Sequence, residues 1–149
     1  MNRPVKLLSV GALTLDTILR VDTLPARQGK FIATDGVQIA SGMASSAACA
    51  ARSLGAHVSL WASAGDDLVG DQLVAGIEAE GVDCSFVRRV AGARSALSAI
   101  LVDTHGERII VPYMTSSPRP TPKRSPLRIS PHSTPSWSTC AGRARQLWP

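Results

Sequence analysis

The sequence has few of the residues that would support a disulfide framework, a zinc site or a membrane span. Its three cysteines, Cys49, Cys84 and Cys140, are far apart, with no paired spacing and no histidine at ligand spacing. No run approaches the roughly 20 apolar residues that a membrane-spanning helix needs. The N-terminal apolar run is short, and Asp16 follows it too soon for a secretory signal peptide. We therefore expect a cytoplasmic protein with no membrane partner.

Acidic residues are missing from the last part of the chain. All 11 Asp and Glu lie in residues 1–114, whereas residues 115–149 contain six Lys and Arg and seven of the ten prolines. The net charge of +5 therefore comes from this C-terminal segment. We expect residues 1–114 to form the folded part, because this length supports one hydrophobic core.

Residues 115–149 have two possible explanations. One is a genuine Pro/Ser/Arg-rich tail, disordered and basic, which would contact nucleic acid through phosphates. No nucleic-acid-binding motif or interleaved aromatic residues support that contact, so a nucleic-acid partner is not expected. The other is a frameshift near residues 112–116. With codons chosen for a GC-rich gene, a shifted frame over residues 130–142 encodes an apolar run that ends in Asp-Val-Arg-Trp.

The first 114 residues alternate between strand and helix patterns, which predicts an α/β fold with a parallel sheet. The expected parallel strands and helices are residues 5–13, 43–54, 57–62 and a helix from Asp66-Asp67 to Gly81. Two hairpins are expected to form a small antiparallel β lid: residues 31–39, turning at Asp35-Gly36, and residues 97–111, turning at 104–106. A short β-like run is expected at residues 84–90.

The stretch Ile39–Ala56 combines a glycine turn with a helix of small residues. Such a turn allows a polar ligand to approach the backbone and the helix N-terminus, but an Ala-rich helix also packs tightly on any sheet. Asp16 is expected just after the first strand, where ligands of open α/β sheets bind. A turn or capping role for Asp16 explains the sequence as well.

Taken together, residues 6–113 resemble the N-terminal half of the ribokinase-like (PfkB-type) carbohydrate kinases. The similar pieces are Val10-Gly11 with Asp16, Leu24-Pro25, the glycine turn and helix ending at Leu54-Gly55-Ala56, and residues 64–70. Within the family, residues 29–33 and 98–110 are most similar to the sulfofructose kinase and ketohexokinase-like branch. The resemblance implies a ribokinase-like parallel sheet with helices on both faces and a β lid. It also implies ATP-dependent phosphorylation of a sugar hydroxyl.

The resemblance places four residues along the sugar: Asp16, Ser41, Gly42 and Ser46. Two of them depart from the family pattern, since Ser41 replaces a glycine and Ser46 replaces an asparagine. Lys30 corresponds to a lid contact for an anionic substituent of the sugar, although a plain surface charge is an equal explanation. The implied partner is therefore a sugar substrate, either neutral or anionic.

The resemblance also implies what this chain lacks. Ala64-Gly65-Asp66-Asp67 is similar to the family's catalytic Gly-Ala-Gly-Asp motif, but it lies too early in the chain, so we assign Asp66 to a helix start. The family's base, anion hole and nucleotide pocket belong to the C-terminal half. We therefore expect a truncated, inactive kinase with no catalytic, cofactor-binding or metal-binding residues.

The intact family member would use ATP and Mg²⁺, neither of which this chain alone is expected to bind. It would form a homodimer through the β lid. A different class of function remains open, a non-catalytic dimerising module with a basic tail that binds nucleic acid.

Overall fold

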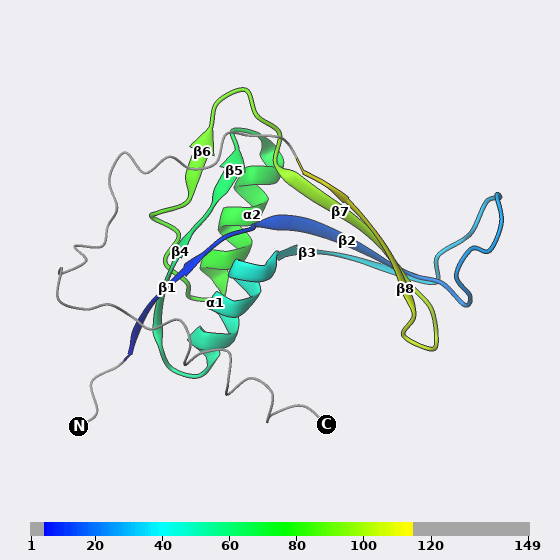
Figure 1. The fold of residues 1–149 in the computed structure, drawn as a ribbon, viewed down its shortest axis with the longest axis horizontal. Helices are drawn as coiled ribbons and strands as arrows, with labels where there is room; N and C mark the ends of the chain where they lie inside the picture. Colours follow the sequence, from blue (N-terminus) through cyan, green and yellow to red (C-terminus); the bar gives the residue numbers. More distant parts are fainter. Residues whose placement is uncertain (1–4, 115–149) are drawn as a thin grey trace, which may run out of the picture.

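The computed structural model describes residues 5–114, which form a helix-packed layer and an extended sheet (Figure 1). The strands are β1 (Lys6–Val10), β2 (Thr14–Arg20), β3 (Asp35–Ser41), β4 (His57–Trp61), β5 (Ser63–Gly65), β6 (Arg88–Val90), β7 (Ala96–Val102) and β8 (Arg108–Tyr113). The helices are α1 (Met43–Ser53) and α2 (Leu68–Ala79). The expected tail, and with it the frameshift hypothesis, lies outside the described residues.

The parallel α/β unit predicted from the sequence is confirmed. β1 pairs with β4 in parallel, and β5 pairs with β6 in the same way. Val58 and Leu60 of β4 are buried in one apolar cluster with residues of both helices. The predicted first strand was too long, because it ends at Val10 and residues 11–13 lead into a second strand. Val10 is also exposed rather than buried, since β1 has a strand partner on only one side among the described residues.

Both predicted helices are present with the expected ends. α1 ends before Gly55, which has φ +90°, and α2 is followed by Gly81, which has φ +79°. Leu73 and Ile77 lie on the buried face of α2, as their spacing indicated. Neither helix in the described part of the chain is long and apolar enough to cross a membrane. The cytoplasmic location stays a prediction.

The predicted β lid corresponds to a four-stranded sheet in the order β3-β2-β7-β8, which we call the lid sheet. The expectation of an antiparallel lid was wrong in one respect, because the two central strands, β2 and β7, are parallel. The hairpin turning at Asp35-Gly36 was also wrong. Both residues lie inside β3, which pairs with β2. Gly36 packs closely against Leu19 of β2, since a Cβ added to Gly36 would lie 3.0 Å from the Cδ2 of Leu19.

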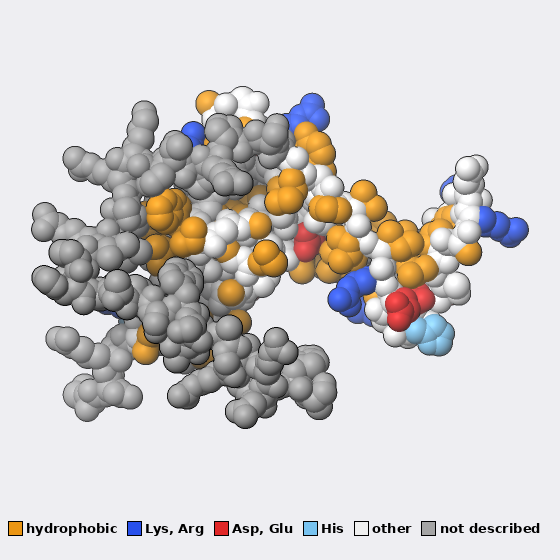
Figure 2. Space-filling view, in the orientation of Figure 1, with side chains coloured by type: hydrophobic (Ala, Val, Ile, Leu, Met, Phe, Trp, Pro, Cys, Tyr) orange, Lys and Arg blue, Asp and Glu red, His pale blue; other side chains and the backbone are white. Residues whose placement is uncertain are grey.

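The lid sheet extends away from the helices as a curved arm (Figure 1). Its base is attached through α2, which lies against β3, and through Leu15 of β2, which belongs to the buried cluster. Farther out, many large apolar side chains of the sheet are exposed, and orange side chains cover much of this arm in Figure 2. The sheet is therefore fixed at one end and open to solvent on both faces at the other.

Candidate functional site

Asp16 lies inside β2, in the third position of the strand, and not just after a strand as the sequence had indicated. The alternation of side chains along β2 places Asp16 on the same sheet face as Thr14. The Oγ1 of Thr14 donates a hydrogen bond of 3.0 Å to the Oδ1 of Asp16. One carboxylate oxygen is thus held by the neighbouring threonine, and no hydrogen bond from the described residues reaches the other.

Two serines complete a polar cluster around Asp16. Ser98 of β7 is the direct cross-strand partner of Asp16, and Ser41 of β3 is the partner of Thr14. Directly paired residues point to the same face, so Thr14, Asp16, Ser41 and Ser98 share one face of the lid sheet. Asp16 is half-buried, whereas Thr14 and Ser98 are each only 9% exposed. Sequence reasoning missed Ser98, because only the β2–β7 register brings it to Asp16.

Gly42 joins this face to the start of α1. Its φ of +115° and ψ of 153° belong to a region that is essentially restricted to glycine. A Cβ at this position would lie 2.4 Å from the carbonyl oxygen of Ala12 and 3.0 Å from the Cα of Leu13. The turn before α1 therefore lies directly against the turn before β2, which brings the helix N-terminus close to the Thr14–Ser41 end of the sheet.

The two serines in the first turn of α1 have different environments. Ser45 is fully buried, and its Oγ donates to the carbonyl oxygens of Ser41, at 2.6 Å, and Gly42, at 3.1 Å. Ser46, the residue selected from the sequence, is exposed, and its N–H donates to the Gly42 oxygen at 2.8 Å. No side chain caps this helix, and its first turn has no acidic residue. Ser45 supports the turn, while Ser46 is accessible to a ligand.

Lys30 is not brought to this cluster within one chain. It is exposed in the loop of residues 21–34, at the far end of the lid sheet (Figure 1). That loop joins Arg20 to Asp35, and Asp16 lies four residues before Arg20 along β2. At 3.3 Å per residue, this separates the loop from Asp16 by about 13 Å of strand. A role for Lys30 toward an anionic substituent stays a prediction.

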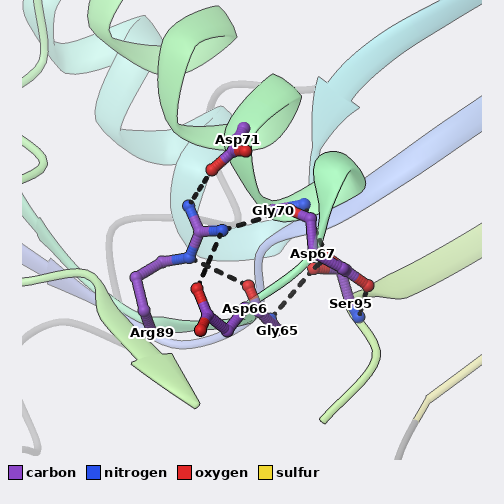
Figure 3. Close-up of polar contacts among 7 residues, drawn as sticks. All are labelled: Gly65, Asp66, Asp67, Gly70, Asp71, Arg89 and Ser95. Carbon is purple, nitrogen blue, oxygen red and sulfur yellow. Dashed lines mark hydrogen bonds and ion pairs between the residues drawn. The ribbon is translucent and has the colours of Figure 1, made fainter. Parts of the chain in front are cut away.

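The acidic pair at the start of α2 is structural in this geometry (Figure 3). The helix begins directly after this pair, as the sequence indicated, with Asp67 as the N-cap, and the Oδ1 of Asp67 accepts the Gly70 N–H at 2.8 Å. Asp66 is exposed and lies 3.9 Å from Arg89. Burial raises the pKa of Asp67, but hydrogen bonds from Ser95 and Gly70 and the charge of Arg89 together outweigh it. The net pKa of Asp67 is lower than usual.

A separate cavity of about 240 Å³ lies at the ends of β1 and β4. Its walls include Gly11, Trp61, Ser63 and Arg94, but not Asp16. The Oγ of Ser63 is buried with no hydrogen-bond partner among residues 5–114. The polar cluster on the lid sheet therefore does not coincide with this hollow. Within the same residues, no three His, Cys, Asp or Glu side chains gather to hold a metal ion.

Comparison with known proteins gives a consistent result. Residues 5–129 match the family model described as pfkB family carbohydrate kinase. The chain is 36% identical over 103 residues to the ATP-dependent ribose-1-phosphate kinase of Halopiger xanaduensis. The aligned region covers 69% of this chain and 35% of that protein. It is 31% identical to the ribokinase of Dictyostelium discoideum, over 68% of this chain and 32% of that protein. The chain thus spans about one third of the length of these relatives.

Solved structures agree with this similarity. A crystal structure assigned to a ribokinase from Agrobacterium tumefaciens has a TM-score of 0.73 and 44% identity, covering 75% of this chain and 37% of the other. The Arabidopsis thaliana ribokinase complexed with ribose and ATP has a TM-score of 0.61 over 74% of this chain and 36% of its own. At 20% identity, the latter match shows the fold alone. The described residues therefore have a ribokinase-like fold.

Proposed function

Since the chain belongs to the pfkB family of carbohydrate kinases, we propose that it supplies the sugar-binding part of an ATP-dependent sugar kinase. The observation that carries this proposal is the polar face of the lid sheet, where Asp16 lies among Thr14, Ser41 and Ser98 beside the start of α1. Sugars present many hydroxyl groups, and this face combines a carboxylate acceptor with hydroxyls that both donate and accept. The narrower resemblance to the sulfofructose kinase and ketohexokinase-like branch stays a prediction.

In this proposal, each residue has a distinct role. The Oδ2 of Asp16 accepts a hydrogen bond from a sugar hydroxyl, and the negative charge strengthens that bond. Thr14 holds the other oxygen and so orients the carboxylate. Ser41, Ser46 and Ser98 supply further hydroxyls, and Gly42 lets the turn come close to the sugar. These contacts bind and orient the sugar, whereas none of these residues transfers the phosphoryl group.

The 149-residue chain on its own is proposed to be inactive. Phosphoryl transfer to an alcohol needs a base at the attacking hydroxyl and donors or Mg²⁺ around the phosphoryl oxygens. Among residues 5–114, the carboxylate of the polar face is Asp16, and in this proposal it binds and orients the sugar. The same residues contain no cluster suited to a metal. We therefore expect the base and the phosphate-binding groups of the kinase to lie outside residues 5–114.

Ribose titration of the full chain, followed by calorimetry or NMR, tests the sugar site. Asp16→Asn should weaken ribose binding about 10- to 100-fold, because a hydrogen bond to a charged group contributes about 1.5–3 kcal/mol. Asp22→Asn is the matched control, since Asp22 is an exposed acid in the distal loop. Ribose binding that is insensitive to Asp16→Asn would contradict the site. Sugar-dependent ATP turnover by the chain would contradict its inactivity.

A homodimer formed through the lid sheet is the second part of the proposal. One row of β-branched side chains crosses all four strands on the Asp16 face: Val37, Ile18, Ile100 and Ile110. Val37 and Ile110 are about half exposed. Such a continuous apolar surface favours burial against a partner.

The oligomeric state tests this surface. Val37→Lys should dissociate the dimer in sedimentation measurements, whereas Gln38→Lys, on the opposite face of the same strand, should leave it intact. Equal effects of both substitutions would contradict the proposed face. The alternative of a nucleic-acid-binding module depends on residues 115–149, outside the described residues, so it stays a prediction.

A further inference from the structure

Asp67 is bound to Ser95, which lies 28 positions later in the chain. The Oδ1 of Asp67 accepts the Oγ–H of Ser95 at 2.6 Å, in addition to the Gly70 N–H. Its Oδ2 accepts the backbone N–H of Ser95 at 2.9 Å. Ser95 is only 2% exposed, so the serine end of these bonds is shielded from water. A single carboxylate thus caps α2 and holds the segment that precedes β7.

Further contacts fix the same group of residues (Figure 3). The Oγ of Ser95 accepts the Gly65 N–H at 2.9 Å, which ties the serine to β5. Arg89 of β6 donates to the carbonyl oxygens of Gly65, at 2.9 Å, and Asp67, at 3.1 Å. Its guanidinium also pairs with Asp71 at 2.8 Å and faces Asp66 at 3.9 Å. The network therefore joins β5, β6, the start of α2 and the residue before β7.

Ser95 directly adjoins the strand whose register aligns the polar face of the lid sheet. Ser95 directly precedes β7, whose first residue, Ala96, pairs with Thr14, and whose third, Ser98, pairs with Asp16. A slip of one residue in a strand moves every side chain to the opposite face. A slip of β7 would thus remove Ser98 from the polar face. The lid sheet has long strands with exposed ends, so an anchor at its base limits such slips.

We propose that Asp67 and Ser95 are positioning residues that anchor the base of the lid sheet and thereby place Ser98 opposite Asp16. The anchoring itself is a property of the fold and is measured without any ligand. Its consequence for sugar binding rests on the proposed function. A missing anchor would be detected by amide exchange without ligand, whereas a missing effect on sugar binding would be detected only by ribose titration.

Two substitutions separate the anchor from the helix cap. Asp67→Asn keeps an oxygen for Gly70 and for the Ser95 hydroxyl, and asparagine caps helices as well as aspartate does. Its amide nitrogen would, however, face the Ser95 N–H, so that donor loses its acceptor. Ser95→Ala removes the hydroxyl and leaves the Gly65 N–H without its acceptor. Ser53→Ala is the matched control, since Ser53 is an exposed serine that bonds only within α1.

Amide hydrogen exchange of the full chain gives the readout, with α2 as an internal reference. Asp67→Asn and Ser95→Ala should accelerate exchange in residues 96–102 about tenfold or more, because a hydrogen bond from Ser95 to a charged group is lost. Exchange in residues 68–79 should change much less in Asp67→Asn, and Ser53→Ala should change neither segment. Unchanged exchange in residues 96–102 would overturn the proposal. So would equal acceleration of residues 68–79 and 96–102 in Asp67→Asn, which would indicate a general loss of structure.

The unmodified chain provides a second measurement that does not depend on the variants folding. The amides of Gly65, Gly70 and Ser95 should share one opening free energy with the first residues of β7, because one network holds them. A Ser95 amide that opens independently of Gly70 would overturn the anchor. Ribose titration of Asp67→Asn should show weaker binding than the unmodified chain. Unchanged ribose affinity together with faster amide exchange in β7 would refute the claim that the anchor places Ser98 for sugar binding. Absence of ribose binding in the unmodified chain would instead refute the proposed function.

Discussion

Replacing Gly42 with alanine should be one of the most destabilising single changes in the described part of the chain. Two independent costs arise at this position. The backbone conformation, with φ +115° and ψ 153°, is strained for any residue with a Cβ, at about 1–3 kcal/mol. The added methyl would also lie 2.4 Å from the carbonyl oxygen of Ala12, which belongs to the backbone and has no rotamer to change. Forced overpacking of this kind costs about 1–3 kcal/mol.

Together these costs reduce the free energy of unfolding by about 2–6 kcal/mol, against a total of about 5–15 kcal/mol for an ordinary domain. Urea unfolding of the full chain, followed by circular dichroism, measures this difference. Gly55→Ala is the matched control, because Gly55 has φ +90° but no atom within 4 Å of the added Cβ. It should lose only about 1–2 kcal/mol, the cost of a left-handed conformation.

The difference between the two variants isolates the contact between the two turns. If Gly42→Ala costs no more than Gly55→Ala, the turn before α1 does not lie against residues 12–13, and the geometry of the polar face is refuted. Because the same contact brings α1 toward Ser41, Gly42→Ala should also weaken ribose binding in whatever fraction of the chain remains folded.

Three other measurements test the packing and the electrostatics. Leu73→Ala should lower the free energy of unfolding by about 2–5 kcal/mol because Leu73 is fully buried. Leu68→Ala, at an exposed position of the same helix, should change this free energy by less than about 0.5 kcal/mol. Equal losses of the two variants in urea unfolding would refute the assigned buried face of α2. The pKa of Asp67 is lower in the folded chain than in the unfolded chain. The ionised Asp67 therefore stabilises the fold above about pH 4, and this stabilisation is lost as the pH falls through the folded-state pKa. Acid titration of the unfolding free energy should show this loss, and Asp67→Asn should not show it. Burial, followed by the nearby acids, raises the pKa of the Cys84 thiol to about 11, so iodoacetamide at pH 8 should modify it at least about 100-fold more slowly than a free cysteine. Mass spectrometry of the labelled chain checks this rate, and rapid labelling of the native protein would contradict the burial of Cys84.

The helices and the parallel pair were predictable because local patterns encode them. α2 carries its capping aspartate, its apolar spacing and its terminal glycine within 15 positions, so no distant residue is needed to recognise it. β2 was missed because the mixed run Thr14–Arg20 follows closely after another strand, and its partners are distant in sequence. The same reason explains the misplaced hairpin at Asp35-Gly36, since β3 pairs back to β2.

The candidate site was predictable in part for similar reasons. Asp16, Ser41 and Gly42 were selected from the resemblance and lie near one another at the base of the lid sheet. Ser98 was not selected, because its relation to Asp16 depends on the register of two strands. Ser45 carried a usable signal, since it precedes the buried Ala48 by three positions on the inward side of α1. Lys30 was placed by resemblance alone, and its loop lies at the far end of the sheet.

The parallel pairing of β2 with β7 also sets the order in which the protein acquires its structure during synthesis. Residues 82 positions apart must meet before the centre of the lid sheet exists, as the contact between Thr104 and Asp22 illustrates. β3 can pair with β2 early, but at 5–20 residues per second β7 leaves the ribosome about 4–16 s after β2. During that interval one edge of β2 is unpaired, a condition that favours association with other chains. Nascent chains halted before residue 96 should therefore depend on chaperones more than chains halted after residue 113.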